Sequence, residues 1–197
     1  MEHLWESLLE CVSEQNFLLV AFQVEDWNRD FSPWKASAVF GKEDFAGQGA
    51  KTLKWLTEEC VPYIDRTFGA KDREHWLMGY SLAGLFALWT AYENDAFSGI
   101  ICCSGSLWFP EWDHYMREHM LRSKCSVYLS LGGKEEKTRN KIMAAVGDRT
   151  RAQEERLEED PMVESVVLEW NAGGHFADAG KRLAKGVRWM FGAKNGL

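Results

Sequence analysis

The 197-residue sequence predicts an α/β protein built on a doubly wound, mostly parallel sheet of about five strands. Two observations carry this prediction. Short apolar runs of strand length alternate with longer helical segments along the chain, which is the order of a parallel sheet. Several of these runs are apolar without interruption, as expected of strands covered on both faces. No repeat, low-complexity segment or linker divides the chain, so we expect a single domain over residues 1–197.

The expected elements follow in order along the chain. Segment 3–13 has its leucines on one face and predicts a helix. The uninterrupted apolar run at 17–22 predicts the first strand. Residues 24–49, rich in Asp, Trp, Gly and Pro, are expected to be a long irregular segment. The remaining expected elements are helix 50–66, strand 76–78, helix 82–92, strand 97–102, strand 126–131, helix 137–158, strand 163–170 and helix 177–191.

Composition limits the classes of function. A net charge of −7 without any basic cluster argues against a nucleic-acid or membrane-surface partner. The N-terminal segment has no signal-peptide core and the chain has no 18-residue apolar run, so we expect a cytoplasmic location. The five cysteines lack the spacing of a disulfide framework or a zinc site, and Cys102 and Cys103 are expected in the core. We expect no metal and no cofactor.

The most informative stretch is Gly-Tyr-Ser-Leu-Ala-Gly at 79–84. It lies between strand 76–78 and helix 82–92, and Ser81 has a small residue two positions before it and two after. This is the sequence form of a nucleophile elbow, a tight turn that holds a serine in a strained backbone conformation. The N-terminus of the following helix suits an oxyanion, with the Leu82 N–H as first donor. The alternative interpretation is an ordinary turn between a strand and a helix.

A serine hydroxyl needs a base beside it and an acid that orients that base. His175 follows the last expected strand in a Gly-Gly-His loop, at the edge where parallel sheets place their chemistry. Glu135 and Glu136 come directly after strand 126–131, so the order Ser81, glutamate, His175 matches the serine–acid–histidine order of α/β-hydrolases. We prefer Glu135 as the acid, with Glu136 as the alternative. The other interpretation of the pair is a charge cluster at a helix N-terminus.

Four segments together resemble the esterase D / enterochelin-esterase-like group of α/β-hydrolases. They are the elbow at 79–84, Ser-Gly-Ser-Leu-Trp at 104–108, Gly-x-x-Glu at 132–135 and Gly-Gly-His at 173–175. The resemblance covers about residues 1–192. In this group the glutamate of the Gly-x-x-Glu segment is the triad acid, which implies Glu135 here. The group contains siderophore esterases, S-formylglutathione hydrolases and small cytoplasmic esterases, and the 26–34 loop resembles the active-site loop of one uncharacterised bacterial branch.

The resemblance also implies a difference from the group. Its members have a strand before the first helix, and the loop after that strand donates one oxyanion N–H. This chain begins inside the first helix, so we expect that strand and its donor to be absent. The missing strand would lie between strand 17–22 and the nucleophile strand. We expect these two strands to close the gap and pair directly. The alternatives are that another chain fills the gap, or that the exposed edge makes the protein poorly soluble. Closure would bring the 25–34 loop towards Ser81, with Trp27 or Asn28 as second oxyanion donor.

The sequence thus predicts a serine hydrolase that cleaves a small carboxylic ester or thioester through an acyl-enzyme intermediate. Tyr80, Trp27, Trp34 and Trp108 are expected to line the substrate pocket, with a role in covering the core as the alternative for the tryptophans. The alternative function is a catalytically weak or inactive hydrolase-fold protein that binds a small ligand or a partner.

Overall fold

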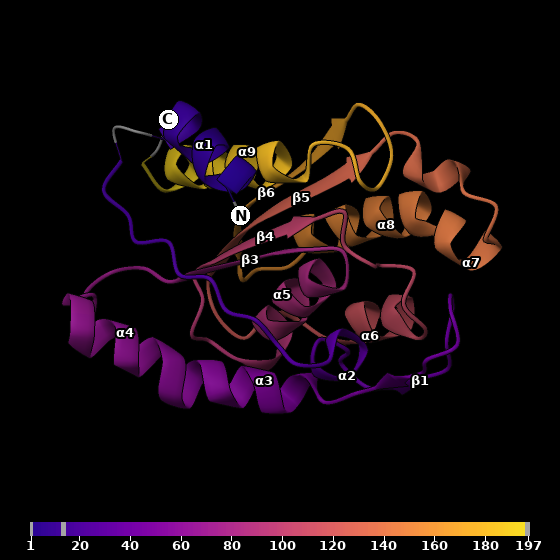
Figure 1. Cartoon of the computed structure of the whole chain (residues 1–197), viewed down its shortest axis with the longest axis horizontal. Coiled ribbons are helices and arrows are strands. Elements are labelled where there is room, and N and C mark those ends of the chain that lie inside the picture. Colours follow the sequence, from indigo (N-terminus) through magenta and orange to yellow (C-terminus); the bar gives the residue numbers. More distant parts are fainter. Residues whose placement is uncertain (1, 13–14, 196–197) are drawn as a thin grey trace.

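The computed structural model describes residues 2–12 and 15–195. Its centre is a sheet of four parallel strands in the order β3-β4-β5-β6 (Figure 1). A separate antiparallel ribbon pairs β1 with β2. The strands are β1 (Lys35–Ala36), β2 (Phe45–Ala46), β3 (Trp76–Tyr80), β4 (Gly99–Cys103), β5 (Cys125–Gly132) and β6 (Val163–Asn171). The predicted fold class is confirmed, with four strands in the main sheet in place of about five.

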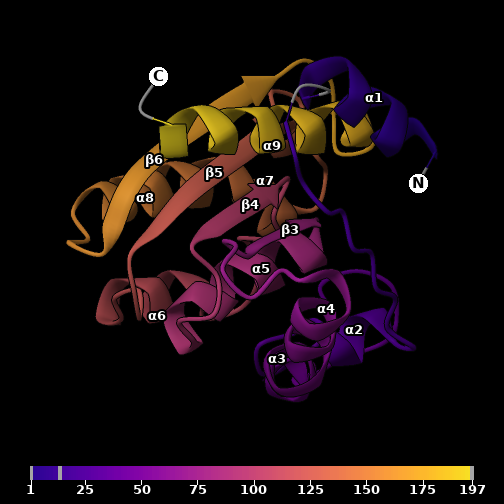
Figure 2. The same cartoon turned by 90° about the vertical axis from the view of Figure 1, so that its left-hand side faces the viewer.

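Helices cover both faces of the sheet, as Figures 1 and 2 show. On one face, α1 (Glu2–Val12) and α9 (Ala179–Asn195) pack against each other and against the sheet. On the other face lie α5 (Leu82–Glu93) and α8 (Val146–Glu158). The remaining helical elements are α2 (Trp27–Asp30), α3 (Gly49–Trp55), a π-helical turn (Leu56–Cys60), α4 (Val61–Phe68), α6 (Trp112–Glu118), a 3-10 turn (Glu135–Lys137) and α7 (Lys141–Ala144).

Strand β4 is apolar along its whole length because helices cover both faces of the sheet at this strand. All of its residues are buried. Ile100 and Cys102 pack into the larger apolar cluster with the side chains of α5, whereas Ile101 and Cys103 pack with α1 and α9. Successive side chains of a strand point to opposite faces, so both faces must be apolar here. All five cysteines are free, and Cys102 and Cys103 are core residues, as expected.

Two long helices of the sequence prediction are subdivided in the structure. The expected helix 50–66 is a continuous helical rod made of α3, the π-helical turn and α4, and it ends at Gly69, whose φ of 65° suits glycine. The expected helix 137–158 is preceded by the 3-10 turn and split into α7 and α8. Asn140 begins α7 by accepting hydrogen bonds from the Ile142 and Met143 N–H groups. The expected irregular segment 24–49 contains α2 and the β1–β2 ribbon.

Segment 17–22, predicted to be a strand, is not part of any strand. Two of its apolar side chains, Leu18 and Val20, are 49% and 43% exposed. A cavity of about 600 Å³ separates the segment from β3, lined mainly by apolar side chains of segment 17–22, β3 and α4. The prediction that the segment closes up and pairs with the nucleophile strand is therefore wrong.

Because segment 17–22 does not pair with it, β3 is an edge strand of the sheet. The His75 carbonyl, just before β3, accepts from the Ser98 N–H beside β4, so alternate residues from 75 onward face β4. The backbone groups of Trp76 and Met78 consequently face the open edge. No backbone hydrogen bond joins 15–25 to β3 among the residues that the structure describes. Without a ladder of hydrogen bonds, an apolar run at 17–22 has nothing to hold it as a strand.

Candidate active site

Ser81 lies at the turn from β3 into α5, in the backbone conformation that a nucleophile elbow requires. Its φ of 61° and ψ of −125° are values that residues with a side chain rarely adopt. The turn is tight enough that a Cβ added at Gly79 would collide with the Ala83 carbonyl oxygen. The Ser81 N–H donates to the Cys103 carbonyl, and the Ser81 carbonyl accepts from the Ser106 N–H. The surrounding backbone therefore fixes the strained residue.

His175 follows β6 and reaches back over the end of the sheet. Its Nε2 lies 3.0 Å from Ser81 Oγ, and its Nδ1 lies 2.7 Å from Glu135 Oε2. Because an ionised carboxylate only accepts hydrogen bonds, Nδ1 is the donor to Glu135 and Nε2 can accept from the serine hydroxyl. The Tyr80 hydroxyl donates to the His175 carbonyl at 2.6 Å, which ties the loop to β3. The His175 side chain is 29% exposed, so the imidazole is open to solvent.

Glu135 lies in the 3-10 turn after β5, and its side chain is 4% exposed. Its Oε1 accepts from the Gly132 N–H at 2.7 Å and from the Ser104 hydroxyl at 2.7 Å, and it pairs with Arg182 Nη1 at 3.0 Å. Burial raises the pKa of the Glu135 carboxyl, but hydrogen bonds from His175, Ser104 and Gly132 outweigh burial and hold that pKa below its usual value. The carboxylate is thus ionised, and Oε2 is directed at His175.

Glu136 takes a different environment, although it is the next residue. Its carboxylate forms an ion pair with Arg151 Nη2 at 2.9 Å on α8. The structure therefore places Glu135, and not Glu136, against His175.

The predicted oxyanion donors lie in different places. Leu82 is the first residue of α5, so its N–H has no acceptor within the helix and lies directly after Ser81. Trp27 begins α2, which packs against α3 and β2. The Trp27 ring is 50% exposed and packs edge-on against Phe31 at 4.9 Å. The Trp27 ring thus packs within its own segment, and no hydrogen bond or ring contact joins Trp27 to a triad residue in the described part of the chain.

The residues predicted to line the pocket are mostly engaged elsewhere. Trp34 donates from Nε1 to the Pro110 carbonyl and stacks with Trp112 at 6.3 Å and an interplanar angle of 17°. Trp108 is 9% exposed and contacts the rings of Phe40 and Phe45. Both tryptophans therefore belong to aromatic clusters that cover the core.

Tyr80, also predicted to line the pocket, has its hydroxyl engaged by polar partners of the site. Besides its bond to the His175 carbonyl, the Tyr80 hydroxyl accepts from Arg182 Nη1 at 3.2 Å and lies 3.1 Å from the Ser104 hydroxyl oxygen. This places the Tyr80 hydroxyl within the polar network beneath the histidine loop.

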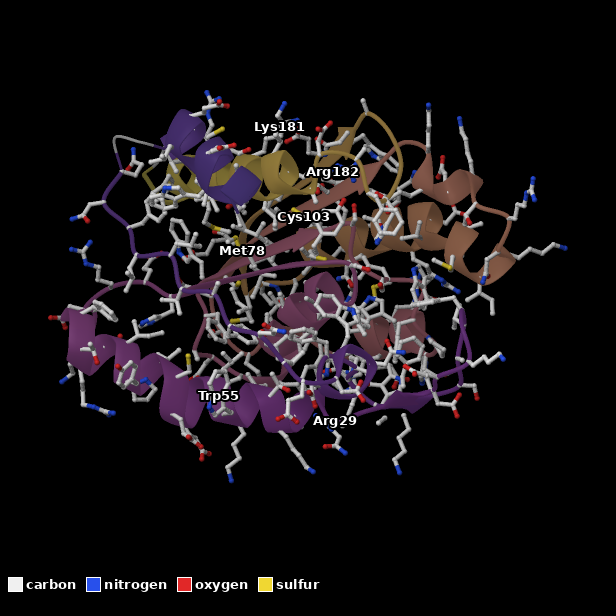
Figure 3. All side chains as sticks on the ribbon, viewed as in Figure 1. Arg29, Trp55, Met78, Cys103, Lys181 and Arg182 are labelled. Atoms are coloured by element: carbon white, nitrogen blue, oxygen red, sulfur yellow. The ribbon has the colours of Figure 1, made fainter. Side chains whose placement is uncertain are left out.

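Three residues of the site were not singled out by sequence reasoning: Ser104, Arg182 and Phe176. Ser104 falls in the 104–108 segment that carried the family resemblance; it has a positive φ of 45°, and its hydroxyl donates to Glu135. Arg182, which Figure 3 labels, lies in the first turn of α9. The residue is 1% exposed. Phe176 is 94% exposed and packs edge-on against the His175 ring at 5.0 Å. Only its position next to His175 in the sequence could have indicated it.

A parallel sheet with helices on both faces and a strained serine at its strand-to-helix turn define an α/β-hydrolase-like domain. Within that class, the chain belongs to the Esterase family, whose model matches residues 2–190. The esterase-like α/β-hydrolase group that the sequence predicted is thus confirmed at the level of the family.

Solved structures show the same fold. The siderophore hydrolase EstA from Aspergillus nidulans matches all of this chain and 79% of its own length, with a TM-score of 0.73 and 15% identity. The siderophore hydrolase EstB from the same organism has a TM-score of 0.63 and 16% identity, covering 83% of this chain. An IroE-like serine hydrolase from Shewanella oneidensis has a TM-score of 0.69 and 17% identity, also covering 83% of this chain. The chain spans only 64% of EstB and 56% of the IroE-like protein.

No functionally curated protein matches the chain significantly. Within residues 2–12 and 15–195, no helix has both the length and the apolar character needed to span a bilayer. In the same part of the chain, no group of three or more His, Cys, Asp or Glu side chains is arranged to hold a metal ion.

Proposed function

We propose that the protein is a serine hydrolase that cleaves a small carboxylic ester or thioester through an acyl-enzyme intermediate. One observation carries the proposal: His175 lies 3.0 Å from the Ser81 hydroxyl and 2.7 Å from the Glu135 carboxylate, at a strained strand-to-helix turn. This is the arrangement in which a base activates a hydroxyl and an acid orients the base. Membership of the Esterase family supports the same class of reaction.

In the first half of the reaction, Ser81 Oγ attacks the ester carbonyl carbon and its proton passes to His175 Nε2. The resulting imidazolium is stabilised by Glu135, which keeps its charge. As the tetrahedral intermediate collapses, the bond to the leaving oxygen or sulfur breaks and His175 returns the proton to that atom. In the second half, water attacks the acyl-Ser81 carbonyl, gives its proton to His175, and the acid is released as the proton returns to Ser81 Oγ.

The negative oxygen of the tetrahedral intermediate needs donors fixed in advance. The Leu82 N–H, at the N-terminus of the buried helix α5, supplies one together with the positive end of the helix dipole. Removal of a single oxyanion donor typically lowers turnover by about 10²–10³-fold. If the Leu82 N–H is the main oxyanion donor, the enzyme is therefore expected to have a low kcat. A high kcat would indicate that a second donor takes part.

Phe176 is expected to contact the substrate. A fully exposed phenylalanine beside the imidazole offers an apolar surface next to the reacting centre, and exposed aromatic rings commonly serve binding. The descriptions of two structural neighbours as siderophore hydrolases support the inclusion of siderophore esters in a substrate screen.

The first test is labelling with a fluorophosphonate probe together with hydrolysis of p-nitrophenyl esters and thioesters of graded acyl length. We expect the probe to label Ser81 and turnover to disappear in Ser81→Ala, with the fold unchanged by circular dichroism. Turnover that survives in Ser81→Ala would refute the assignment of the nucleophile.

The second candidate is a hydrolase-fold protein that binds a small ligand or partner without efficient catalysis. The observation that favours it is the position of Trp27, the expected second donor, which packs against Phe31 in a helix that contacts α3 and β2. Absence of labelling and of turnover in the folded protein would favour this candidate.

A further inference from the structure

Arg182 lies where neither burial nor helix electrostatics favours an arginine. It is 1% exposed, and it belongs to the first turn of α9, where the helix dipole disfavours a positive charge. Its neighbour Lys181 is exposed; Figure 3 labels both, with Lys181 at the outer surface of α9 and Arg182 between α9 and the sheet. The Arg182 Nε has no hydrogen-bond partner in the described part of the chain. Such local conflicts typically mark residues retained for function.

The two terminal nitrogens of Arg182 contact two different parts of the site. Nη1 lies 3.0 Å from Glu135 Oε1 and donates to the Ser104 hydroxyl at 2.8 Å. Nη2 donates to the Ala172 carbonyl at 3.2 Å and to the Gly174 carbonyl at 2.9 Å. One guanidinium therefore joins the turn after β5 to the loop after β6.

We propose that Arg182 is a positioning residue that holds the acid and the histidine loop of this site in their mutual geometry. The proposal rests on the proposed function, because it assigns Glu135 and His175 to acid and base. Arg182 itself touches neither Ser81 nor a reacting atom; it acts through Glu135 and through the backbone on either side of Gly173.

The two carboxylate oxygens of Glu135 have different partners, and this difference explains how Arg182 acts. Oε1 is occupied by Arg182, Ser104 and the Gly132 N–H, so the carboxylate is held in one orientation and Oε2 remains for His175. The planar guanidinium provides several donors in a fixed fork, which a lysine ammonium cannot reproduce. A lysine at this position can place a charge near Glu135, but it cannot also bind both loop carbonyls.

The charge of Arg182 also affects the proton shared by Glu135 and His175. Removal of a nearby positive charge makes this pair hold a proton more tightly, so the acid limb of a pH–rate profile moves to higher pH. Two other titratable groups near the guanidinium are neutral. Burial raises the pKa of the Tyr80 hydroxyl, and burial raises the pKa of the Cys103 thiol to about 12.

The test compares Arg182→Met, Arg182→Lys and the matched control Lys181→Met, which removes the adjacent exposed charge of the same helix turn. In Arg182→Met we expect kcat to fall by about 10²–10³-fold, with a small change in KM and an acid limb displaced to higher pH. In Arg182→Lys we expect the acid limb to stay in place while kcat falls about tenfold, because the charge remains and the fork is lost. Lys181→Met should retain the kcat and the pH profile of the original protein.

A second readout does not depend on turnover. The proton between His175 Nδ1 and Glu135 should give a low-field proton NMR signal. We expect this signal in the original protein, in Arg182→Lys and in Lys181→Met. We expect it to be lost in Arg182→Met. This pattern in a protein without esterase activity would keep the positioning role and reject only the proposed function. An unshifted acid limb and an intact signal in folded Arg182→Met would overturn the proposal. Failure of both Arg182 variants to fold would assign the residue to stability alone and also overturn it.

Discussion

Gly132→Ala tests how tightly the site is packed around Glu135. A Cβ at residue 132 would lie 2.7 Å from the Gly173 carbonyl oxygen, 2.8 Å from Arg182 Nη2 and 2.9 Å from Glu135 Oε1. An ordinary contact of this kind begins at 3.4 Å, so these atoms must move apart by about 0.5–0.7 Å. Since a 1 Å misplacement of reacting groups can cost about 10²-fold, we expect kcat to fall by roughly 10–100-fold. Overpacking of this size is expected to destabilise the fold by about 1–3 kcal/mol.

The adjacent residue provides a matched control. A Cβ at Gly133 would meet only the Asn171 carbonyl oxygen, at 3.7 Å, which is an ordinary contact. Gly133→Ala is therefore expected to keep both its kcat and its melting temperature. The assay is hydrolysis of p-nitrophenyl acetate with thermal unfolding of the same samples. Equal activity of the two variants would refute the view that close packing against residue 132 sets the position of the acid.

The remaining predictions concern the acid and the aromatic residues. Glu135→Gln is expected to lower kcat by about 10⁴-fold, whereas Glu136→Gln should leave the rate of ester hydrolysis nearly unchanged. The reverse ranking would assign the role of triad acid to Glu136. Because the folded-state pKa of Glu135 is depressed, its ionisation stabilises the fold above about pH 4.3, and that stability is lost as the pH falls through the lowered pKa. Urea unfolding at decreasing pH should therefore show a steeper loss of stability in the original protein than in Glu135→Gln, and parallel curves would contradict this. Trp34→Ala is expected to lower the free energy of unfolding by about 3 kcal/mol, or Tm by roughly 10 °C, with unaltered acyl preference. An altered acyl preference at constant Tm would show that Trp34 lines the substrate pocket. Phe176→Ala should keep its Tm and raise KM for long acyl esters by about tenfold, and an unchanged KM would exclude the contact.

Local features of this site could be predicted from the sequence because they depend on few residues. The elbow needs small residues around Ser81, and a Cβ at Gly79 would meet the Ala83 carbonyl oxygen only four residues along. His175 could be placed because the carboxyl end of a parallel strand fixes which edge of the sheet a following loop reaches.

The distinction between Glu135 and Glu136 depends on contacts that the sequence does not display. Two adjacent carboxylates on a turn point in different directions, and which one turns inward depends on the Gly132 N–H and the partner groups across the sheet. Arg182 was not predicted because its burial results from the packing of α9 over β4 and β5, whose residues lie far from Arg182 in the sequence. Its one local signal is a positive charge in the first turn of a helix.

Composition alone could not separate pocket tryptophans from core tryptophans. Trp34 and Trp108 lie on segments that reach the site-bearing side of the sheet, yet their rings pack against other aromatic rings. Large aromatic side chains contribute much of the buried area in any domain, so position on a loop does not establish contact with a substrate.

The elbow and segment 17–22 differ in what supports them, which explains why one prediction agrees with the structure and the other does not. The Ser81 backbone is fixed from the inner side: its N–H donates to Cys103, its carbonyl accepts from Ser106, and α5 behind it is buried from Gly84 to Tyr92. None of these contacts involves the open edge of β3, so a strained residue can persist on an edge strand. Segment 17–22 could be a strand only through hydrogen bonds across that edge, where the cavity of about 600 Å³ lies instead. The integrity of the nucleophile turn is thus independent of what occupies the far side of β3.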